Sequence, residues 1–344
     1  MSRTACGCSR TLYRISDRGC FPKLMLYAIR HFTCYRYSQA VWQSMMEVRM
    51  HPRSEGNQRC FVFQLSVNPR ARIFGYTDSY GNLVHHFDLP SRHGQLTIIS
   101  DALVNIDAQP SAPELMDYEG WSDLEQLVEK KDYWDMLIPS HFARPSPELE
   151  ELAKEIGATE RDGRSPLAFL QDTAAGVHRS FNYVKKSTAV RSPIEHALRL
   201  RQGVCQDFAH VMIALVRNAK IPCRYVSGYL YRSSENAHPA TDGATHAWVE
   251  ALLPGVGWVG FDPTIDRLVG EGHIRTAIGR DYANVPPTMG VMKGKTDTQL
   301  QVRVRVTPSQ TLLPPDEDFA ADEEWSQFLD ETQQLHLVDA QQQQ

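Results

Sequence analysis

The chain has 344 residues, 42% of them hydrophobic, a composition typical of a folded protein with two domains or one large one. Its net charge of −5 is uneven: the last 37 residues hold nine acidic and no basic residues, so the rest holds 36 basic against 32 acidic ones. This near balance argues against a nucleic-acid partner, and the lack of any apolar run of eighteen residues argues against a membrane span.

The first 24 residues differ from those that follow. They hold five Arg or Lys residues, one acidic residue and three of the seven cysteines. A basic, acid-poor beginning is typical of a targeting segment, but the strand-like run that opens at Met25 agrees equally well with a start assigned too far upstream. The other four cysteines show no disulfide framework, so we expect a reducing, cytoplasmic location.

Residues 25–110 are expected to form an antiparallel β-domain of the sandwich kind. Short β-branched and aromatic runs alternate there with Pro, Gly and Asn, and DSYGN predicts a turn between two strands. Residues 111–164 carry prolines and short helical runs. We therefore expect a helical linker between the β-domain and a second domain.

Residues 165–307 are expected to form that second domain, with helices first and strands afterwards. Ser165 and Ser192, each followed by a proline, predict two helix starts, and Gly203 is expected to supply the left-handed residue after the second helix. CRYVSGYLY, ATHAWVEALLP and GWVGFDPT are strand candidates, and LQVRVRV is expected to close the domain. Strands and helices do not alternate, so the fold class is α+β. Residues 308–344 are expected to be a disordered acidic tail.

Cys205 stands at the start of a further predicted helix. Apolar residues recur after it at steps of three and four: Phe208, Val211, Met212, Leu215 and Ala219. Unpaired N–H groups at a helix N-terminus favour negative charge, so they would stabilise the thiolate, the nucleophilic form of cysteine. Most free cysteines are buried and inert, so a catalytic assignment also needs a base.

A base and an orienting acid are available on two later strands. His246 lies 41 residues after Cys205, and Asp262 lies 16 residues after His246. If the loop between the strands is 253–257, Trp248 lies opposite Asp262 and His246 is diagonal to it on the same face. A four-residue loop would place the histidine and the acid on opposite faces. A cysteine nucleophile needs such a histidine, oriented by a third polar group.

Four segments resemble the transglutaminase-like cysteine enzymes, in particular the bacterial-type branch with an N-terminal β-domain: GVCQDFAH, IPCRYVSGYL, THAWVEALLPGVGWVGFDPT and AIGRDYANVPP. RHFTCYRYSQAV and DSYGNLVHHF are similar to that β-domain, so the resemblance covers about residues 25–307. It implies a papain-like core with a catalytic triad of Cys205, His246 and Asp262. It also implies acyl transfer on a peptide or protein amide through a thioester, as a protease, an amidase or a glutamine transferase.

Other residues of the expected cleft have lesser roles. The backbone N–H of the nucleophile is the first expected oxyanion donor, and Gln202 and Tyr183 are candidates for the second. Trp248 is expected to line the substrate cleft. Asp207 and Arg224 are expected to be members of structural ion pairs. No acidic cluster with calcium-loop spacing occurs in the core, so we expect no metal and no other cofactor.

Three other interpretations were weighed. A zinc site built from Cys205, His210, Cys223 and His246 lacks the usual ligand spacing. GVMKGKT at 290–296 has three residues between its glycines where a phosphate loop has four. A non-catalytic binding or assembly module stays open as an interpretation, because fold does not fix function.

We expect water rather than an amine to accept the acyl group, because nothing in the sequence marks a channel for a lysine side chain.

Overall fold

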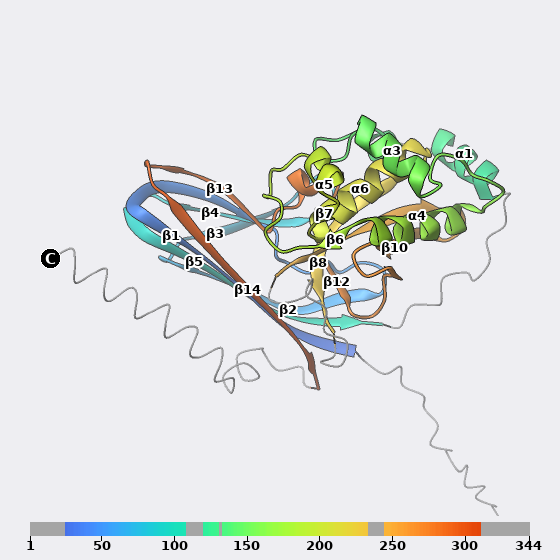
Figure 1. Ribbon diagram of the computed structural model, residues 1–344. Helices are drawn as coiled ribbons and strands as arrows, with labels where there is room; N and C mark the ends of the chain where they lie inside the picture. Colours follow the sequence, from blue (N-terminus) through green and yellow to red (C-terminus); the bar gives the residue numbers. More distant parts are fainter. Residues whose placement is uncertain (1–24, 108–119, 131–132, 233–243, 311–344) are drawn as a thin grey trace, which may run out of the picture.

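The computed structural model describes residues 25–107, 120–130, 133–232 and 244–310 (Figure 1). The predicted N-terminal extension and the predicted tail from residue 311 onward lie outside these residues. The described chain forms an antiparallel β-domain beside a core of helices and strands, so the predicted α+β class is confirmed. Among the helices described, none has the length and apolar character needed to cross a bilayer.

The β-domain is a curved half-barrel sheet built around one long strand. Strands β1 to β5 form its main path in the order β2-β5-β1-β4-β3. Strand β1 changes partners where its register shifts between Arg36 and Val41: β5 pairs with its first part and β4 with its second. Bending one strand lets a single sheet fold over its own apolar face. The bounds are β1 (Met25–Val48), β2 (Gln58–Asn68), β3 (Ile73–Thr77), β4 (Leu83–Leu89) and β5 (His93–Ile106).

The last two strands return to the β-domain, which differs from the sequence-based expectation. Strand β14 (Thr298–Ser309) contains LQVRVRV and pairs with β1 from Leu26 to Tyr37, so it does not close the second domain. Strand β13 (Thr288–Lys293) pairs with the second part of β1. Strand β14 also includes residues 308 and 309, the first two residues of the predicted tail. Alternation predicts a strand but not its partner, and β1 offers β14 an otherwise unpaired edge.

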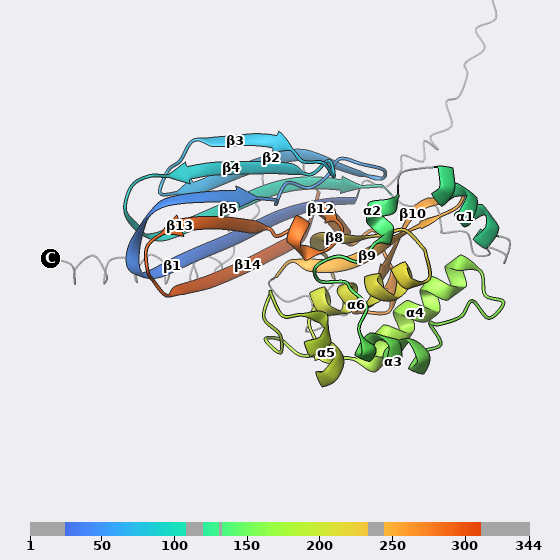
Figure 2. The same ribbon diagram turned by 90° about the horizontal axis from the view of Figure 1, so that it is seen from above.

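The core packs helices on one face of a five-stranded sheet with the order β11-β10-β9-β8-β12. Helix α6 packs on β8 and β9, and α4 packs on α6 and β10. Figure 2 shows helices α3 to α6 on the side of this sheet away from the β-domain. The bounds are α3 (Pro147–Glu155), α4 (Pro166–Ser180), α5 (Ile194–Leu200), α6 (Cys205–Asn218), β8 (Cys223–Leu230), β9 (His246–Leu253), β10 (Gly257–Asp262), β11 (Arg267–Leu268) and β12 (His273–Gly279).

Short elements surround the core. Helices α1 and α2 lie in the stretch predicted to be a helical linker, and one pair of short strands and a 3-10 turn lie closer to Cys205 and His246. The parallel pair β6-β7 sets Tyr183 opposite Gly203. The bounds are α1 (Gly120–Lys130), α2 (Trp134–Leu137), β6 (Asn182–Tyr183), β7 (Gln202–Gly203) and η3 (Tyr282–Asn284).

The predicted helix starts are borne out at one position and differ at the other. The Ser165 hydroxyl accepts the Ala168 N–H at 3.2 Å, as a helix cap should. Helix α5 begins after Pro193 without a side-chain cap, and the residue with positive φ at its end is Arg201, at 51°. Gly203 is required for a different reason: a Cβ there would lie 2.7 Å from Cβ of Asp207.

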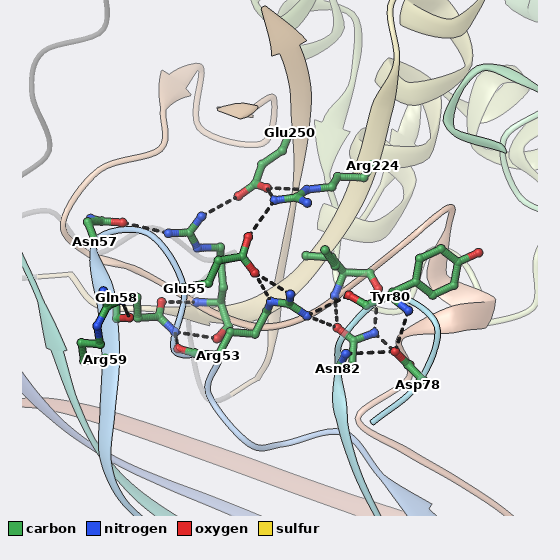
Figure 3. A network of polar contacts seen from close by, with 12 residues as sticks. Arg53, Glu55, Asn57, Gln58, Arg59, Asp78, Tyr80, Asn82, Arg224 and Glu250 are labelled. Carbon is green, nitrogen blue, oxygen red and sulfur yellow. Dashed lines mark hydrogen bonds and ion pairs between the residues drawn. The ribbon is translucent and has the colours of Figure 1, made fainter. Parts of the chain in front are cut away.

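A buried ionic network joins the β-domain to the core (Figure 3). Glu250 on β9 is 2% exposed and lies 2.7 Å from Arg224 on β8 and 3.4 Å from Arg275 on β12. Arg224 also reaches Glu55 of the β-domain at 3.4 Å, and Arg275 donates to Asn57 at 2.8 Å. The expected ion-pair role of Arg224 is therefore confirmed. Polar groups of the β-domain thus contact the buried charges of the core across the seam of the two domains.

Glu250→Gln is expected to destabilise the protein by about 3 kcal/mol, because it removes the buried charge that pairs with both Arg224 and Arg275 and leaves Arg224 with only the more distant Glu55. Urea unfolding measures the change. The control is Glu125→Gln, which breaks the exposed pair with Arg161 (side chains 57% and 35% exposed) and should change the stability by less than about 1 kcal/mol. Equal effects of the two substitutions would contradict the structural role of the network.

Candidate active site

Cys205 is the first residue of α6 and is partly exposed. The side chain of Asp207 fixes this turn: its Oδ2 accepts the Val204 N–H at 2.8 Å and the Thr188 hydroxyl at 2.6 Å. Asp207 was expected in an ion pair, and the structure instead makes its carboxylate the acceptor for the N-cap N–H of Val204, a role set by its position three residues after that residue. The cap holds the cysteine where the N–H groups of the first turn point outward.

His246 and Asp262 form a buried hydrogen-bonded pair on adjacent strands. Leu253 pairs with Gly257 and Val249 with Phe261, so the predicted five-residue loop and register are confirmed. His246 Nε2 lies 2.6 Å from Asp262 Oδ2, and the two residues are 2% and 0% exposed. The backbone N–H of Thr264 donates to Asp262 Oδ1 at 3.0 Å. The carboxylate is thus held at both oxygens.

The charges of this pair reinforce each other. Burial by itself would lower the pKa of His246, but the Asp262 carboxylate, aided by the Cys205 thiol, raises that pKa to about 10. Burial would raise the pKa of Asp262, and the neighbouring histidines hold it well below its usual range. His246 Nδ1 is buried and has no hydrogen-bond partner in the described part of the chain. This nitrogen is therefore free to exchange a proton with the thiol of Cys205.

A second histidine, His273 at the start of β12, completes the cluster and was missed from the sequence. Its Nε2 lies 3.1 Å from Asp262 Oδ2, the oxygen that also binds His246. Strand β12 pairs with β8 and not with β10, so no chain-neighbour pattern links His273 to Asp262. Its position in GEGHIRT carries no spacing signal that sequence reasoning could have used.

The geometry of this cluster fits hydrogen bonds better than metal ligation. Among the residues that the structure describes, His246, Asp262 and His273 are the one set of three side chains able to share an ion, with ligand atoms within 4.8 Å of one another. Ligands of a tetrahedral zinc lie roughly 3.3 Å apart. The separations from the Asp262 oxygen, 2.6 and 3.1 Å, are shorter.

The residues of the weighed zinc site are engaged elsewhere. His210 stacks on Phe142 at 5.1 Å and accepts the Tyr282 N–H at 3.2 Å, and burial lowers its pKa to about 3. The buried Cys223 thiol donates to the Ile213 carbonyl at 3.6 Å. Two of the four residues considered as zinc ligands, His210 and Cys223, thus have other partners inside the core.

The three residues expected to line the cleft, Trp248, Tyr183 and Gln202, differ in burial. Trp248 is fully buried under Tyr80 of the β-domain and Val269, so it does not line an open cleft as expected. The β-domain covers this face of the core sheet, which the sequence of the core alone does not reveal. Tyr183 is half-buried, and burial together with the charges of Cys205 and Asp207 raises its pKa. Gln202 is half-buried on β7, next to the left-handed Arg201.

A cavity of about 490 Å³ lies at the seam of the two domains; Cys205 itself is not one of its lining residues. The amide of Gln206, the residue after Cys205, donates to the Val190 carbonyl at 2.9 Å, and Val190 lines the cavity. Tyr282 lines it too; burial, Tyr35 and Cys205 together raise the pKa of Tyr282 to about 12. Most of the lining is apolar or aromatic, including Tyr35, Tyr37, Met46, Phe142, Met289 and Met292.

Family models and related proteins both assign this chain to the transglutaminase-like superfamily. Residues 150–263 match the transglutaminase-like superfamily, and residues 27–105 match the bacterial transglutaminase-like N-terminal region. An uncharacterized protein of Mycobacterium leprae is 31% identical over 279 residues, which cover 80% of this chain and 96% of that protein. A protein-glutamine gamma-glutamyltransferase of Pseudomonas aeruginosa is 28% identical over 149 residues, 41% of this chain but 21% of that enzyme.

A solved structure supports the fold. The crystal structure of a Cytophaga hutchinsonii protein, provisionally described as a cysteine protease, superposes with a TM-score of 0.65. The match covers 85% of this chain and 93% of the other, at 22% sequence identity. At this identity the similarity establishes the arrangement of the elements and not a shared reaction.

Proposed function

We propose that this chain, which belongs to the transglutaminase-like superfamily, is a cysteine peptidase or amidase that hydrolyses amide bonds through a thioester. One observation carries the proposal: a buried His246–Asp262 pair, bonded at 2.6 Å, that raises the pKa of His246 beside Cys205 at a helix N-terminus. A scaffold without chemistry would not need a buried imidazole charged in this way.

The geometry supports a two-step reaction. His246 Nδ1 holds the proton of the Cys205 thiol, and the thiolate attacks the amide carbonyl carbon to form a tetrahedral oxyanion. The backbone N–H at the start of α6 is placed to stabilise that oxyanion. His246 then gives its proton to the leaving nitrogen as the C–N bond breaks, which leaves a thioester. Water attacks the thioester while His246 takes the water's proton, and the returning proton releases Cys205 as the thiol.

The seam cavity supports a peptide substrate with a large apolar side chain. Its lining is aromatic and aliphatic and includes Val190, whose carbonyl accepts from the Gln206 amide, and Tyr282, whose pKa is raised in part by Cys205. Burial of an apolar side chain there would position the scissile amide over the thiol. The alternative of glutamyl transfer to an amine is favoured by the name of the Pseudomonas relative, which matches this chain over 41% of its length.

The test is mass spectrometry of a glutamine-containing peptide library incubated with the protein and an excess of primary amine. Hydrolysis predicts backbone cleavage or a deamidation of about one dalton that is lost in Cys205→Ala. A dominant amine adduct would replace the proposal with the transferase. No change in any peptide would favour the binding module.

Val190→Trp is expected to narrow the cavity and to lower kcat/KM about tenfold for peptides with a phenylalanine beside the scissile bond. Peptides with alanine there should be affected less. Val190 is 55% exposed, so the larger side chain does not disturb the core. Val256→Trp, at another exposed valine (42%), serves as the control and should leave both substrates unchanged. A uniform loss for both peptides would contradict this use of the cavity.

A further inference from the structure

We propose that His273 is a positioning residue of the site: as a neutral donor through Nε2–H, it fixes the Asp262 carboxylate in the orientation that holds His246. The inference rests on the proposed function, because a fixed His246 matters only if His246 exchanges a proton with Cys205. His273 touches neither the thiol nor the cavity. It acts through Asp262.

The hydrogen bonds of His273 define its tautomer. The backbone N–H of Gly270 donates to His273 Nδ1 at 3.2 Å, so Nδ1 must present a lone pair. The ring hydrogen is then on Nε2, which lies 3.1 Å from Asp262 Oδ2, and an ionised carboxylate can only accept. The backbone N–H of His273 also donates to the Gly270 carbonyl at 3.0 Å. Backbone and ring are therefore clamped to the same glycine.

Three donors converge on the Asp262 carboxylate. Thr264 N–H binds Oδ1 at 3.0 Å, and both His246 and His273 bind Oδ2 through Nε2. Asp262 is 0% exposed, so no bulk water can replace a lost donor. Without His273 the carboxylate would keep one donor on each oxygen and could turn about its last torsion. His246 would turn with it, because apart from Cys205 its other ring nitrogen has no partner in the described residues.

The sheet register explains how so distant a strand reaches this carboxylate. Gly228 on β8 pairs with His246 on β9 and with Arg275 on β12, so His273, two residues from Arg275, lies on the same face as His246. The absence of a side chain at Gly228 leaves room for the Trp248 ring, which a Cβ would approach to 2.5 Å. That ring contacts His273 edge-on at 5.2 Å. His273 is thereby buried in a fixed orientation at the end of the sheet.

The experiment compares His273→Gln with His273→Asn in the full chain. The Gln amide nitrogen reaches about as far as Nε2 and can still donate to Asp262. The shorter Asn amide can accept from Gly270 but cannot reach Asp262. We expect Asn to lower kcat about 10- to 100-fold with KM and Tm nearly unchanged, and Gln to recover most of the loss. Equal losses in the two variants, or losses that follow Tm, would overturn the role of His273.

Nitrogen-15 NMR of the imidazole rings gives a second readout that needs no variant. The proposal expects the neutral Nε2–H tautomer for His273 at neutral pH, and the Nδ1–H tautomer or a charged ring would overturn it. Failure of the proposed function is distinguishable: the wild type would then lack turnover that depends on Cys205. Wild-type turnover together with a fully active His273→Asn protein contradicts the role of His273 alone.

Discussion

Cys205→Ala is expected to lower kcat by about 10⁴-fold or more while leaving the fold intact. In the proposed reaction the thiol supplies the electron pair that forms the thioester, and no other described side chain at the start of α6 can replace it. Alanine is a good helix former, and the cysteine side chain is partly exposed, so its removal leaves no large cavity. Peptide turnover and thermal unfolding of the same preparation measure the two halves of this expectation.

Cys60→Ala is the matched control. Cys60 is also a partly exposed free cysteine, but it lies on β2 of the β-domain and donates to the Val62 carbonyl at 3.2 Å. Burial raises its pKa to about 11, which keeps it a thiol at neutral pH. We expect this variant to keep wild-type turnover. If Cys205→Ala retained more than a tenth of the wild-type rate, the assignment of the nucleophile would be wrong.

Local patterns predicted those parts of the site that depend on neighbouring strands. The five-residue loop between β9 and β10 fixed the register, and the register set His246 and Asp262 on one face, as found. The serine cap at Ser165 and the helix that begins at Cys205 are likewise properties of short stretches of chain. Side-chain period and turn length are sufficient for such predictions.

Contacts between distant strands were not predictable in this way. Strand β12 pairs with β8, and two strands separate it in the sheet from β10, which carries Asp262, so His273 could not be assigned to Asp262. Strand β14 has the alternation of any half-exposed strand, and only the open edge of β1 decides its partner. Trp248 was misplaced for the same reason: the β-domain that buries it is far away in sequence. A pattern of one segment does not contain the identity of its partner.

Asp262→Asn is expected to have the second-largest effect, a loss of kcat of about 10⁴-fold with the nucleophile still present. The amide replaces one of the two acceptor oxygens with an NH2 group, which cannot accept from the Thr264 N–H or from the histidines, and it carries no charge. With the carboxylate gone, burial is the main influence left on His246, so its pKa should fall below its ordinary value of 6.5. The imidazole would then be neutral at pH 7 and could not hold the proton of the thiol.

The pH dependence follows from the same pair. The wild-type pKa of His246, about 10, lies above the unfolded value of 6.5, so its contribution to stability is complete below pH 6.5 and is lost as the pH rises through about 10. The difference in unfolding free energy between wild type and Asp262→Asn should therefore be largest just below pH 6.5 and shrink as the pH rises toward 10. NMR titration of His246 and urea unfolding at several pH values measure both effects.

Asp101→Asn, which breaks a 2.6 Å ion pair with Arg30 in the β-domain, is the control and should lose stability but keep its kcat. A His246 that titrates at the same pH in wild type and Asp262→Asn would show that the carboxylate does not set its charge.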